Sequence, residues 1–229
     1  MINVIKYLLS IFVMLSPIFN LKAQNLNIDL REVNLAYKNA RSISADVEVL
    51  VYSRNDVTNT RVFLGRFFKS GLNYYSGIMD VFYLKNARCS IILDKNLRYV
   101  QYAGTKKTLA GPSTLPDFES QVDSLQKQIK SFNLISKSSR SISYRAFLLD
   151  KSIVEYIDIT ISLPGYTLGE LVYYYQKDFE TERVSVKYKN VTLNEVIPEG
   201  DFSEYKFIKY VNGKIVPAEP YKNYRLIIK

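Results

Sequence analysis

The carboxylates of Asp158, Glu170 and Glu180 are candidates for acid–base chemistry. Two carboxylates held about 5 to 10 Å apart can hydrolyse a glycosidic bond, but no spacing in the sequence brings two of these three together. The chain has no histidine and a single cysteine, Cys89, which excludes Ser-His-Asp and Cys-His pairs, histidine metal sites and cysteine zinc sites. Its nine glycines form no phosphate-binding loop. We therefore expect a protein that is not an enzyme, with no catalytic residue, no metal site and no cofactor.

The first residues are typical of an export signal. Lys6 precedes the apolar run "YLLSIFVML", and the small residue Ala23 stands at a suitable processing site. The apolar run is shorter than the roughly 20 residues that span a bilayer. We therefore expect residues 1–23 to be a signal peptide that is cleaved before Gln24, and the mature protein to be soluble in the periplasm.

Residues 24–229 have a length that suits one domain with its own core. The net charge of +9 falls to +7 after cleavage, because Lys6 and Lys22 leave with the signal. The basic residues are scattered rather than clustered in a dense arm, so we expect no nucleic-acid partner. One cysteine allows no internal disulfide, and we expect Cys89 to be a small buried apolar residue of a monomer.

The first part of the mature chain predicts a helix followed by a strand. Residues 27–41 carry an apolar stripe at helical spacing, with Asn27 as a possible N-cap. The next run, "ISADVEVLVYS", alternates apolar and polar residues, as a strand with one buried face does. The apolar positions of the helix are Leu30, Val33, Tyr37 and Ala40, and those of the strand are Ile43, Ala45, Val47, Val49 and Val51.

Further strand-like runs follow, with one interruption. "TRVFLGRFFK", "LNYYSGIMDVFYL", "CSIILD" and "LRYVQYA" predict an antiparallel meander. Residues 116–132 then predict a second helix with a stripe of Phe118, Val122, Leu125, Ile129 and Phe132. Four more strands are expected in "SISYRAFLL", "SIVEYIDITIS", "ELVYYYQKD" and "ERVSVKYKNVTL". In the second, Ile153, Ile157, Ile159 and Ile161 are expected on one face and Val154, Tyr156, Asp158 and Thr160 on the other. The C-terminal part, with an "NGK" turn and two prolines, predicts pairing at a sheet edge.

Two helices are too few to cover both faces of so large a sheet, so the sheet must curl around them. We expect a mainly β fold with two helices, built as an unclosed, strongly curved antiparallel β-barrel with the helices against its concave face. In "LVYYYQKDF" we expect Tyr173 and Tyr175 to share the face of Leu171, and Tyr174 to lie on the other face, where its hydroxyl reaches water.

The order of these elements resembles the LolA/LolB type of periplasmic lipoprotein carrier, in a divergent form. The matching stretches are "VNLAYKNARSISADVEV", "GRFFKSGLNYYSGIMDVFYLKNARCSIILDKNLRYVQY", the second helix, and "VSVKYKNVTLNEVIPEGDFSEYKF", which together span nearly all the mature chain. The resemblance implies an apolar groove with a helical lid. In that family an arginine next to a proline helps to hold the lid closed, and Arg66 is a partial match without the proline.

The functional expectation is a carrier that binds the acyl chains of a lipoprotein, or another amphiphile, for transfer toward the outer membrane. Membrane-associated envelope proteins are further expected partners. The alternative is a non-catalytic structural or interaction module of the cell envelope with a solid core, and apolar patterning alone does not separate the two. The expected lipid-binding residues are Val47, Val49, Phe63, Phe67, Ile157, Ile159, Tyr173, Val184 and Val186, and the expected lid residues are Phe118, Val122, Leu125 and Ile129.

Basic residues outnumber acidic ones in two regions. Six of them, Lys127, Lys130, Lys137, Arg140, Arg145 and Lys151, are opposed only by Asp150, and the C-terminal part from Lys206 holds six against Glu219. They are either ordinary solvated surface or groups that guide docking to an acidic partner or to anionic lipid head groups.

Overall fold

The computed structural model describes residues 25–56, 60–104, 118–149 and 153–229. The expected signal peptide, 1–23, lies outside these ranges. Within them, no helix combines the length and the apolar character that crossing a membrane requires.

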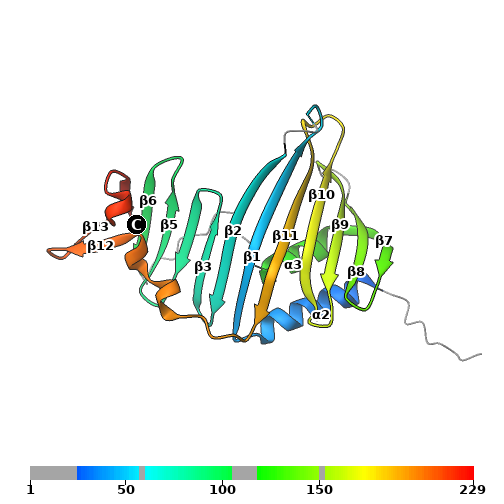
Figure 1. Cartoon of the computed structure of the whole chain (residues 1–229), viewed down its shortest axis with the longest axis horizontal. Helices are drawn as coiled ribbons and strands as arrows, with labels where there is room; N and C mark the ends of the chain where they lie inside the picture. Colours follow the sequence, from blue (N-terminus) through cyan, green and yellow to red (C-terminus); the bar gives the residue numbers. More distant parts are fainter. Residues whose placement is uncertain (1–24, 57–59, 105–117, 150–152) are drawn as a thin grey trace, which may run out of the picture.

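Twelve strands of the described chain form one large sheet, in the order β14-β6-β5-β4-β3-β2-β1-β11-β10-β9-β8-β7. Every pair is antiparallel except β14 and β6, which run parallel. The two edge strands, β14 and β7, do not pair, so the barrel is unclosed, and Figure 1 shows the sheet curving around two helices. The predicted fold class is confirmed.

The bounds of these elements follow. The helices are α2 (Leu26–Asn39) and α3 (Phe118–Gln128). The strands of the large sheet are β1 (Ser42–Ser53), β2 (Arg61–Ser70), β3 (Asn73–Ile78), β4 (Val81–Lys85), β5 (Cys89–Asp94), β6 (Tyr99–Gly104), β7 (Ile129–Lys137), β8 (Ser141–Leu148), β9 (Val154–Ser162), β10 (Thr167–Tyr175), β11 (Thr181–Leu193) and β14 (Arg225–Ile228). Strands β12 (Ile208–Val211) and β13 (Lys214–Pro217) form a separate hairpin, and 3₁₀ turns lie at Glu199–Phe202, Glu204–Lys206 and Glu219–Tyr221.

Helix α2 is anchored to the concave face of the sheet. Its N-cap is Asn25, whose side chain accepts a hydrogen bond from Asn27 N, so the cap predicted at Asn27 was placed two residues late. The hydroxyl of Tyr144 on β8 donates a hydrogen bond to the buried carboxylate of Asp29. Leu30, Val33 and Tyr37 of the predicted stripe are at 0% exposure, as is Leu26. Ala40, the fourth predicted member, is the half-buried C-cap residue just beyond the helix.

Helix α3 is shorter than the sequence predicted. It ends at Gln128, and Ile129 and Phe132 belong to β7, which pairs with β8. The helical spacing of these two residues misled the prediction, because pairing with a neighbouring strand overrode a weak local preference. Val122 and Leu125 are buried in the same core as the stripe of α2, so both helices pack on one face, as predicted. We call this cluster on the concave face the inner core.

Two strand predictions also need correction. "LNYYSGIMDVFYL" is a hairpin of β3 and β4, with Met79 in the turn at a positive φ of 57°. Ile153 precedes β9 and is 53% exposed, whereas Ile157, Ile159 and Ile161 are buried as predicted. Val154 was expected opposite Ile157 but packs against the inner core with it, because the register of β9 and β10 shifts between Val154 and Tyr156.

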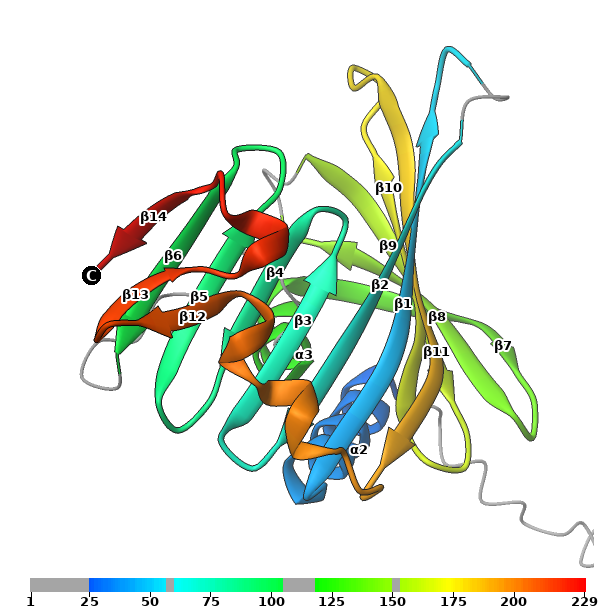
Figure 2. The same cartoon turned by 60° about the vertical axis from the view of Figure 1, so that its left-hand side comes forward.

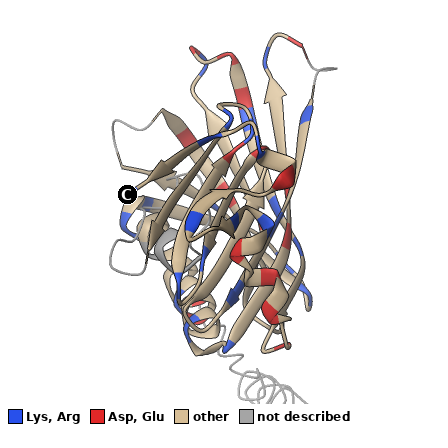
Figure 3. Cartoon of the chain, turned by 90° about the vertical axis from the view of Figure 1, so that its left-hand side faces the viewer, with Lys and Arg blue, Asp and Glu red and all other residues tan. Residues whose placement is uncertain are grey.

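The opposite, outer face carries a second core under the C-terminal segment, residues 199–229. Figure 2 shows this segment in front of β3–β6, with α3 behind them. We call the cluster the outer core; it comprises Leu84, Cys89, Ile91, Leu93, Val100, Tyr102, Phe207 and Ile208. Basic and acidic residues are interspersed over the elements seen from this end of the sheet (Figure 3). The sheet therefore buries different strands on opposite faces.

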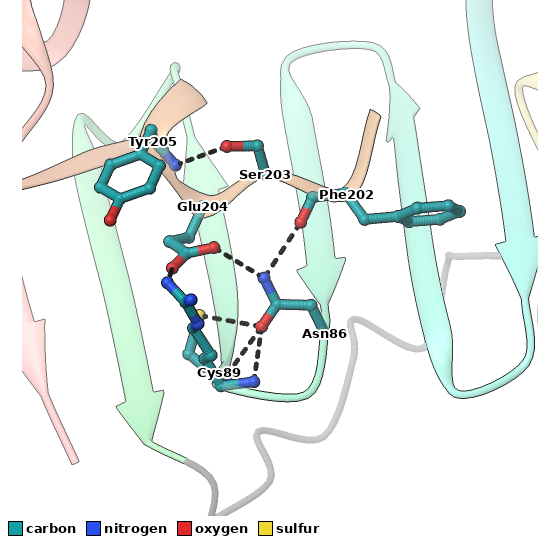
Figure 4. Close-up of polar contacts among 7 residues, drawn as sticks. Asn86, Cys89, Phe202, Ser203, Glu204 and Tyr205 are labelled. Atoms are coloured by element: carbon teal, nitrogen blue, oxygen red, sulfur yellow. Dashed lines mark hydrogen bonds and ion pairs between the residues drawn. The ribbon is translucent and has the colours of Figure 1, made fainter. Parts of the chain in front are cut away.

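A buried carboxylate fastens this segment to the turn before β5 (Figure 4). Glu204, 4% exposed, accepts hydrogen bonds from Asn86 Nδ2 at 2.9 Å and from Arg88 Nη1 at 3.3 Å. Asn86 also donates to Phe202 O at 3.0 Å and accepts from Cys89 N at 3.0 Å. One amide side chain therefore bridges two distant parts of the chain.

Two of the three tyrosines of β10, Tyr173 and Tyr174, lie on the opposite faces predicted for them. Tyr173 packs against the inner core, while Tyr174 stacks on Tyr156 of β9 on the outer face, with ring centroids 4.4 Å apart. The guanidinium of Arg145 lies 4.2 Å from the Tyr156 ring centroid and donates to both oxygens of Asp158, at 2.8 and 2.9 Å. The tyrosine on the second face thus belongs to a row of side chains that crosses strands.

Candidate functional site

A cavity of about 210 Å³ lies between α3 and the concave face of β8, β9 and β10. Its walls come from the helix on one side and from three neighbouring strands on the other. The lining residues are Val122, Ser124, Leu125, Gln128, Leu148, Val154, Ile157, Leu168, Leu171 and Tyr173.

The cavity has a buried end and an exposed end. Ile157, Leu168 and Leu171 are at most 2% exposed and form the apolar inner end. Ser124 and Gln128 are exposed, and Gln128 Nε2 donates a hydrogen bond to Ser124 Oγ at 3.2 Å. An amphiphile would therefore place its apolar part inward and its polar part beside these two side chains.

Tyr173 is the half-buried aromatic residue in the lining. Burial raises the pKa of its hydroxyl to about 12, because the phenolate would lose its hydration. The hydroxyl is therefore protonated at neutral pH and can donate a hydrogen bond.

The structure divides the nine predicted lipid-binding residues. Ile157 and Tyr173 line the cavity. Val47, Val49, Phe67 and Ile159 are buried in the inner core, and Phe63, Val184 and Val186 are half-buried against it. Lipid contact by these nine residues stays a prediction.

The four predicted lid residues are divided as well. Val122 and Leu125 line the cavity from α3. Ile129 starts β7 rather than continuing the helix, and packs against the inner core. The side chain of Phe118 lies outside the described residues.

Six lining residues were not predicted. Leu171 follows from strand parity, since it had been placed on the face of Tyr173. Leu168 shares that face only because the register of β10 and β9 shifts between Leu168 and Glu170, which no alternation in the sequence predicts. Ser124 and Gln128 lie on the polar side of the predicted helix, where no pattern separates a cavity mouth from solvated surface. Leu148 and Val154 lie at the facing ends of β8 and β9, a place that only the tertiary structure reveals.

The three carboxylates considered for catalysis form no pair in the structure. Asp158 is held by Arg145, Glu170 accepts a hydrogen bond from Ser185 Oγ at 2.6 Å, and Glu180 is exposed. No group of three or more Cys, Asp or Glu residues that could hold a metal ion occurs in the part of the chain that the structure describes.

Arg66 cannot hold a lid in the way that the family resemblance implied. Its Nε donates to Asp46 Oδ1 at 3.1 Å, and this pair lies on the outer face, away from the helices. A broader hollow of about 610 Å³ is found there, with the Asp46–Arg66 and Glu48–Lys189 ion pairs in its walls. Its charges are already paired, so it lacks the separation of apolar and polar ends seen in the cavity.

The basic group around β7 is solvent-exposed in its described part. Lys127, Lys130, Lys137 and Arg140 are exposed, whereas Arg145 is occupied by Asp158. Lys151 and Asp150 lie outside the described residues.

The fold and the cavity together define an open half-barrel with a cavity of mixed apolar and polar lining under a helix. No protein-family model and no curated protein sequence matches the chain. Among solved structures, an uncharacterised conserved protein from Thermus thermophilus aligns with 90% of this chain and 100% of its own, at 8% identity and a TM-score of 0.48.

Two further likenesses are of the same kind. A LolA superfamily protein from Nitrosomonas europaea aligns with 80% of this chain and 99% of its own, at 9% identity and a TM-score of 0.34. A chain of the Pseudomonas aeruginosa MucA/MucB complex aligns with 77% of this chain and 59% of its own, at 11% identity and a TM-score of 0.40. These likenesses concern the fold alone.

Proposed function

We propose that the protein is a soluble periplasmic carrier that binds the acyl chain of a lipoprotein or of another amphiphile and passes it toward the outer membrane. The observation that supports this proposal is the cavity of about 210 Å³ with its apolar inner end and its Ser124–Gln128 mouth. Apolar walls with a few polar groups at one end are typical of sites for small amphiphiles.

The energetics suit reversible binding. Each methylene group buried in the cavity contributes about 0.8 kcal/mol, so a short chain binds with a free energy of a few kcal/mol. That affinity is weak enough for release to an acceptor that buries the chain better. The wall that faces the sheet is α3, a helix of 11 residues, which is a small element to displace during loading.

The experiment fills the cavity and follows the binding of a defined probe. The probe is an octyl chain linked through its amine to a nitrobenzoxadiazole fluorophore, whose emission rises when it leaves water. Ile157→Phe places a ring in the buried end, so we expect the protein to stay folded and to lose probe binding. Ile161→Val is the matched control, since Ile161 is buried on the same face of β9 and does not line the cavity.

Three results decide between the candidates. Loss of binding in Ile157→Phe with retention in Ile161→Val supports the carrier. If both variants bind the probe as well as the unmodified protein does, the probe binds outside this cavity. A folded unmodified protein that binds no probe favours the second candidate, the envelope module with a solid core, which the complete burial of α2 against the sheet also favours.

A further inference from the structure

We propose that the outer face of β1, β2 and β8–β11 is a docking surface for an extended segment of another protein, and that Arg183 binds an acidic side chain of that segment. This surface lies on the opposite side of the sheet from the cavity, so the inference does not depend on the proposed function. It follows from a row of stacked side chains, from a guanidinium without a carboxylate, and from the way in which the chain covers the other half of the same face.

A row of large side chains crosses five neighbouring strands on the outer face. Its members, from β1 to β8, are Tyr52, Arg183, Tyr174, Tyr156 and Phe147, and each stands directly opposite the next in the strand register. Figure 1 shows these ends of β1, β10 and β11 at the top of the sheet, away from the C-terminal segment. Because Tyr174 stacks on Tyr156 with ring centroids 4.4 Å apart, the rings are held in place before a partner arrives, which lowers the entropic cost of binding.

Two arginines of this face differ in what their guanidinium groups bind. The fork of Arg145 is filled by both oxygens of Asp158, at 2.8 and 2.9 Å. The guanidinium of Arg183 lies 4.1 Å from the ring centroid of Tyr52, and no carboxylate within the described ranges pairs with it. A guanidinium stacked on a ring keeps its planar fork in one orientation, and that fork matches the two oxygens of a carboxylate. Arg183 is therefore suited to bind a carboxylate from another molecule.

Aliphatic side chains lie beside the row. Val62 and Leu64 on β2 are 54% and 70% exposed, and Val62 stands opposite Leu50 of β1. In the same register Leu50 and Val172 flank Ser185 of β11. Tyrosine and arginine next to apolar side chains are the residues that contribute most to binding at protein interfaces.

The other half of the outer face shows which kind of segment fits. Residues 199–229 lie over β3–β6 there (Figure 2), and Phe207 is 3% exposed in the outer core. The same segment contributes the buried carboxylate of Glu204, which accepts a hydrogen bond from Arg88 at 3.3 Å. The half with Arg183 offers the same combination of aromatic surface and cation. An extended segment with one acidic side chain among apolar ones therefore complements it in charge and in polarity.

The test selects binders from a phage-displayed library of random peptides on the immobilised mature chain, residues 24–229. Peptides of about nine residues suffice, since roughly six extended residues span five strands. We expect the selected peptides to share an Asp or Glu at one position. Its replacement by Asn or Gln should weaken binding about 10- to 100-fold in fluorescence anisotropy, because a hydrogen bond to a charged group is lost. Arg183→Gln should cause a loss of the same size, and both changes together should weaken binding no more than either alone.

Two variants are controls. Arg66→Gln changes an exposed arginine of the same face whose Nε already donates to Asp46 at 3.1 Å, so peptide binding should persist. Arg183→Lys keeps the charge but not the planar fork, so it should bind more tightly than Arg183→Gln and less tightly than the unmodified protein. Arg183 does not line the cavity, so both of its variants should still bind the octyl probe if the proposed function is correct.

The remaining outcomes overturn the inference. The first is a selection that yields no peptide, or peptides that bind Arg183→Gln as well as the unmodified protein. The second is a dimer in sedimentation experiments that Arg183→Gln dissociates, which would make a second copy of this chain the occupant. The third is Arg183-dependent binding to vesicles of phosphatidylglycerol with no binding of acidic peptides, which would make a lipid surface the occupant.

Discussion

Asn86→Ala should detach the C-terminal segment from the sheet without unfolding the inner core. The Asn86 amide donates to the buried carboxylate of Glu204 at 2.9 Å and to Phe202 O at 3.0 Å, and accepts from Cys89 N at 3.0 Å. A hydrogen bond to a buried charge contributes about 2 kcal/mol and each of the other two about 1 kcal/mol. The expected cost is therefore about 3 to 4 kcal/mol, a large part of the roughly 5 to 15 kcal/mol that stabilises a domain.

Cys89 reports this opening directly. It is the only cysteine of the chain, it is 3% exposed beneath the C-terminal segment, and burial raises the pKa of its thiol to about 12. A thiol reagent therefore reacts only when the segment opens. Under native conditions we expect the labelling rate of Asn86→Ala to rise by about two to three powers of ten, at 1.4 kcal/mol for each tenfold change.

Two comparisons make the prediction refutable. Glu204→Ala breaks the same contact from the C-terminal side and leaves the turn next to Cys89 intact, so it should also speed labelling. Leu30→Ala destabilises the inner core by a similar amount, about 2 to 5 kcal/mol. If Leu30→Ala speeds labelling as much as Asn86→Ala, the two cores unfold together, and the assignment of the segment as a separate unit is refuted.

Three further predictions concern the sheet and its tyrosines. Arg145→Met should lower the free energy of unfolding by about 1 kcal/mol in urea titrations, because its bonds to Asp158 are only partly shielded from solvent. Gly77→Ala should cost about 1 to 3 kcal/mol, since its Cβ would lie 2.7 Å from a ring carbon of the facing phenylalanine, whereas Gly200→Ala, with nothing within 4 Å, should be neutral. The pKa of about 12 at Tyr173 exceeds the value near 10 of a tyrosine in the unfolded chain, so the contribution of this residue to the free energy of unfolding is complete below pH 10 and is lost between pH 10 and 12. Tyr173→Phe should therefore lessen the loss of stability at alkaline pH, measured as the urea midpoint at pH 9 and 11.

Alternation of apolar residues predicted the faces of β1 correctly, but it failed at Val154 in β9, where the register shifts. In β1, Ile43, Ala45, Val47 and Val49 are all buried, as the period of two required. The same reasoning placed Tyr173 and Tyr174 on opposite faces. Such strands are predictable because one face is buried along most of their length and the register cannot slip by one residue without exposing it.

The sequence contains a partial indication of the outer core. Cys89 to Leu93 are buried at five successive positions, and an apolar run without alternation indicates a strand covered on both faces. What covers the second face depends on residues more than 100 positions later, so no local pattern identifies Phe207 as the partner. The cavity was equally out of reach, because its volume is what remains between α3 and the sheet after every neighbouring side chain has packed.

The pairing of β1 with β11 sets the order in which the protein can be completed during synthesis. Ser44 Oγ and Thr192 Oγ1 lie 2.8 Å apart although 148 residues separate them. At about 5 to 20 residues per second, a ribosome needs roughly 7 to 30 s to add those residues, and β1 meanwhile has an unpaired edge beside its apolar face. The sheet therefore cannot be completed until nearly the whole chain has been made, and a fragment that ends before residue 181 leaves this edge of β1 unpaired.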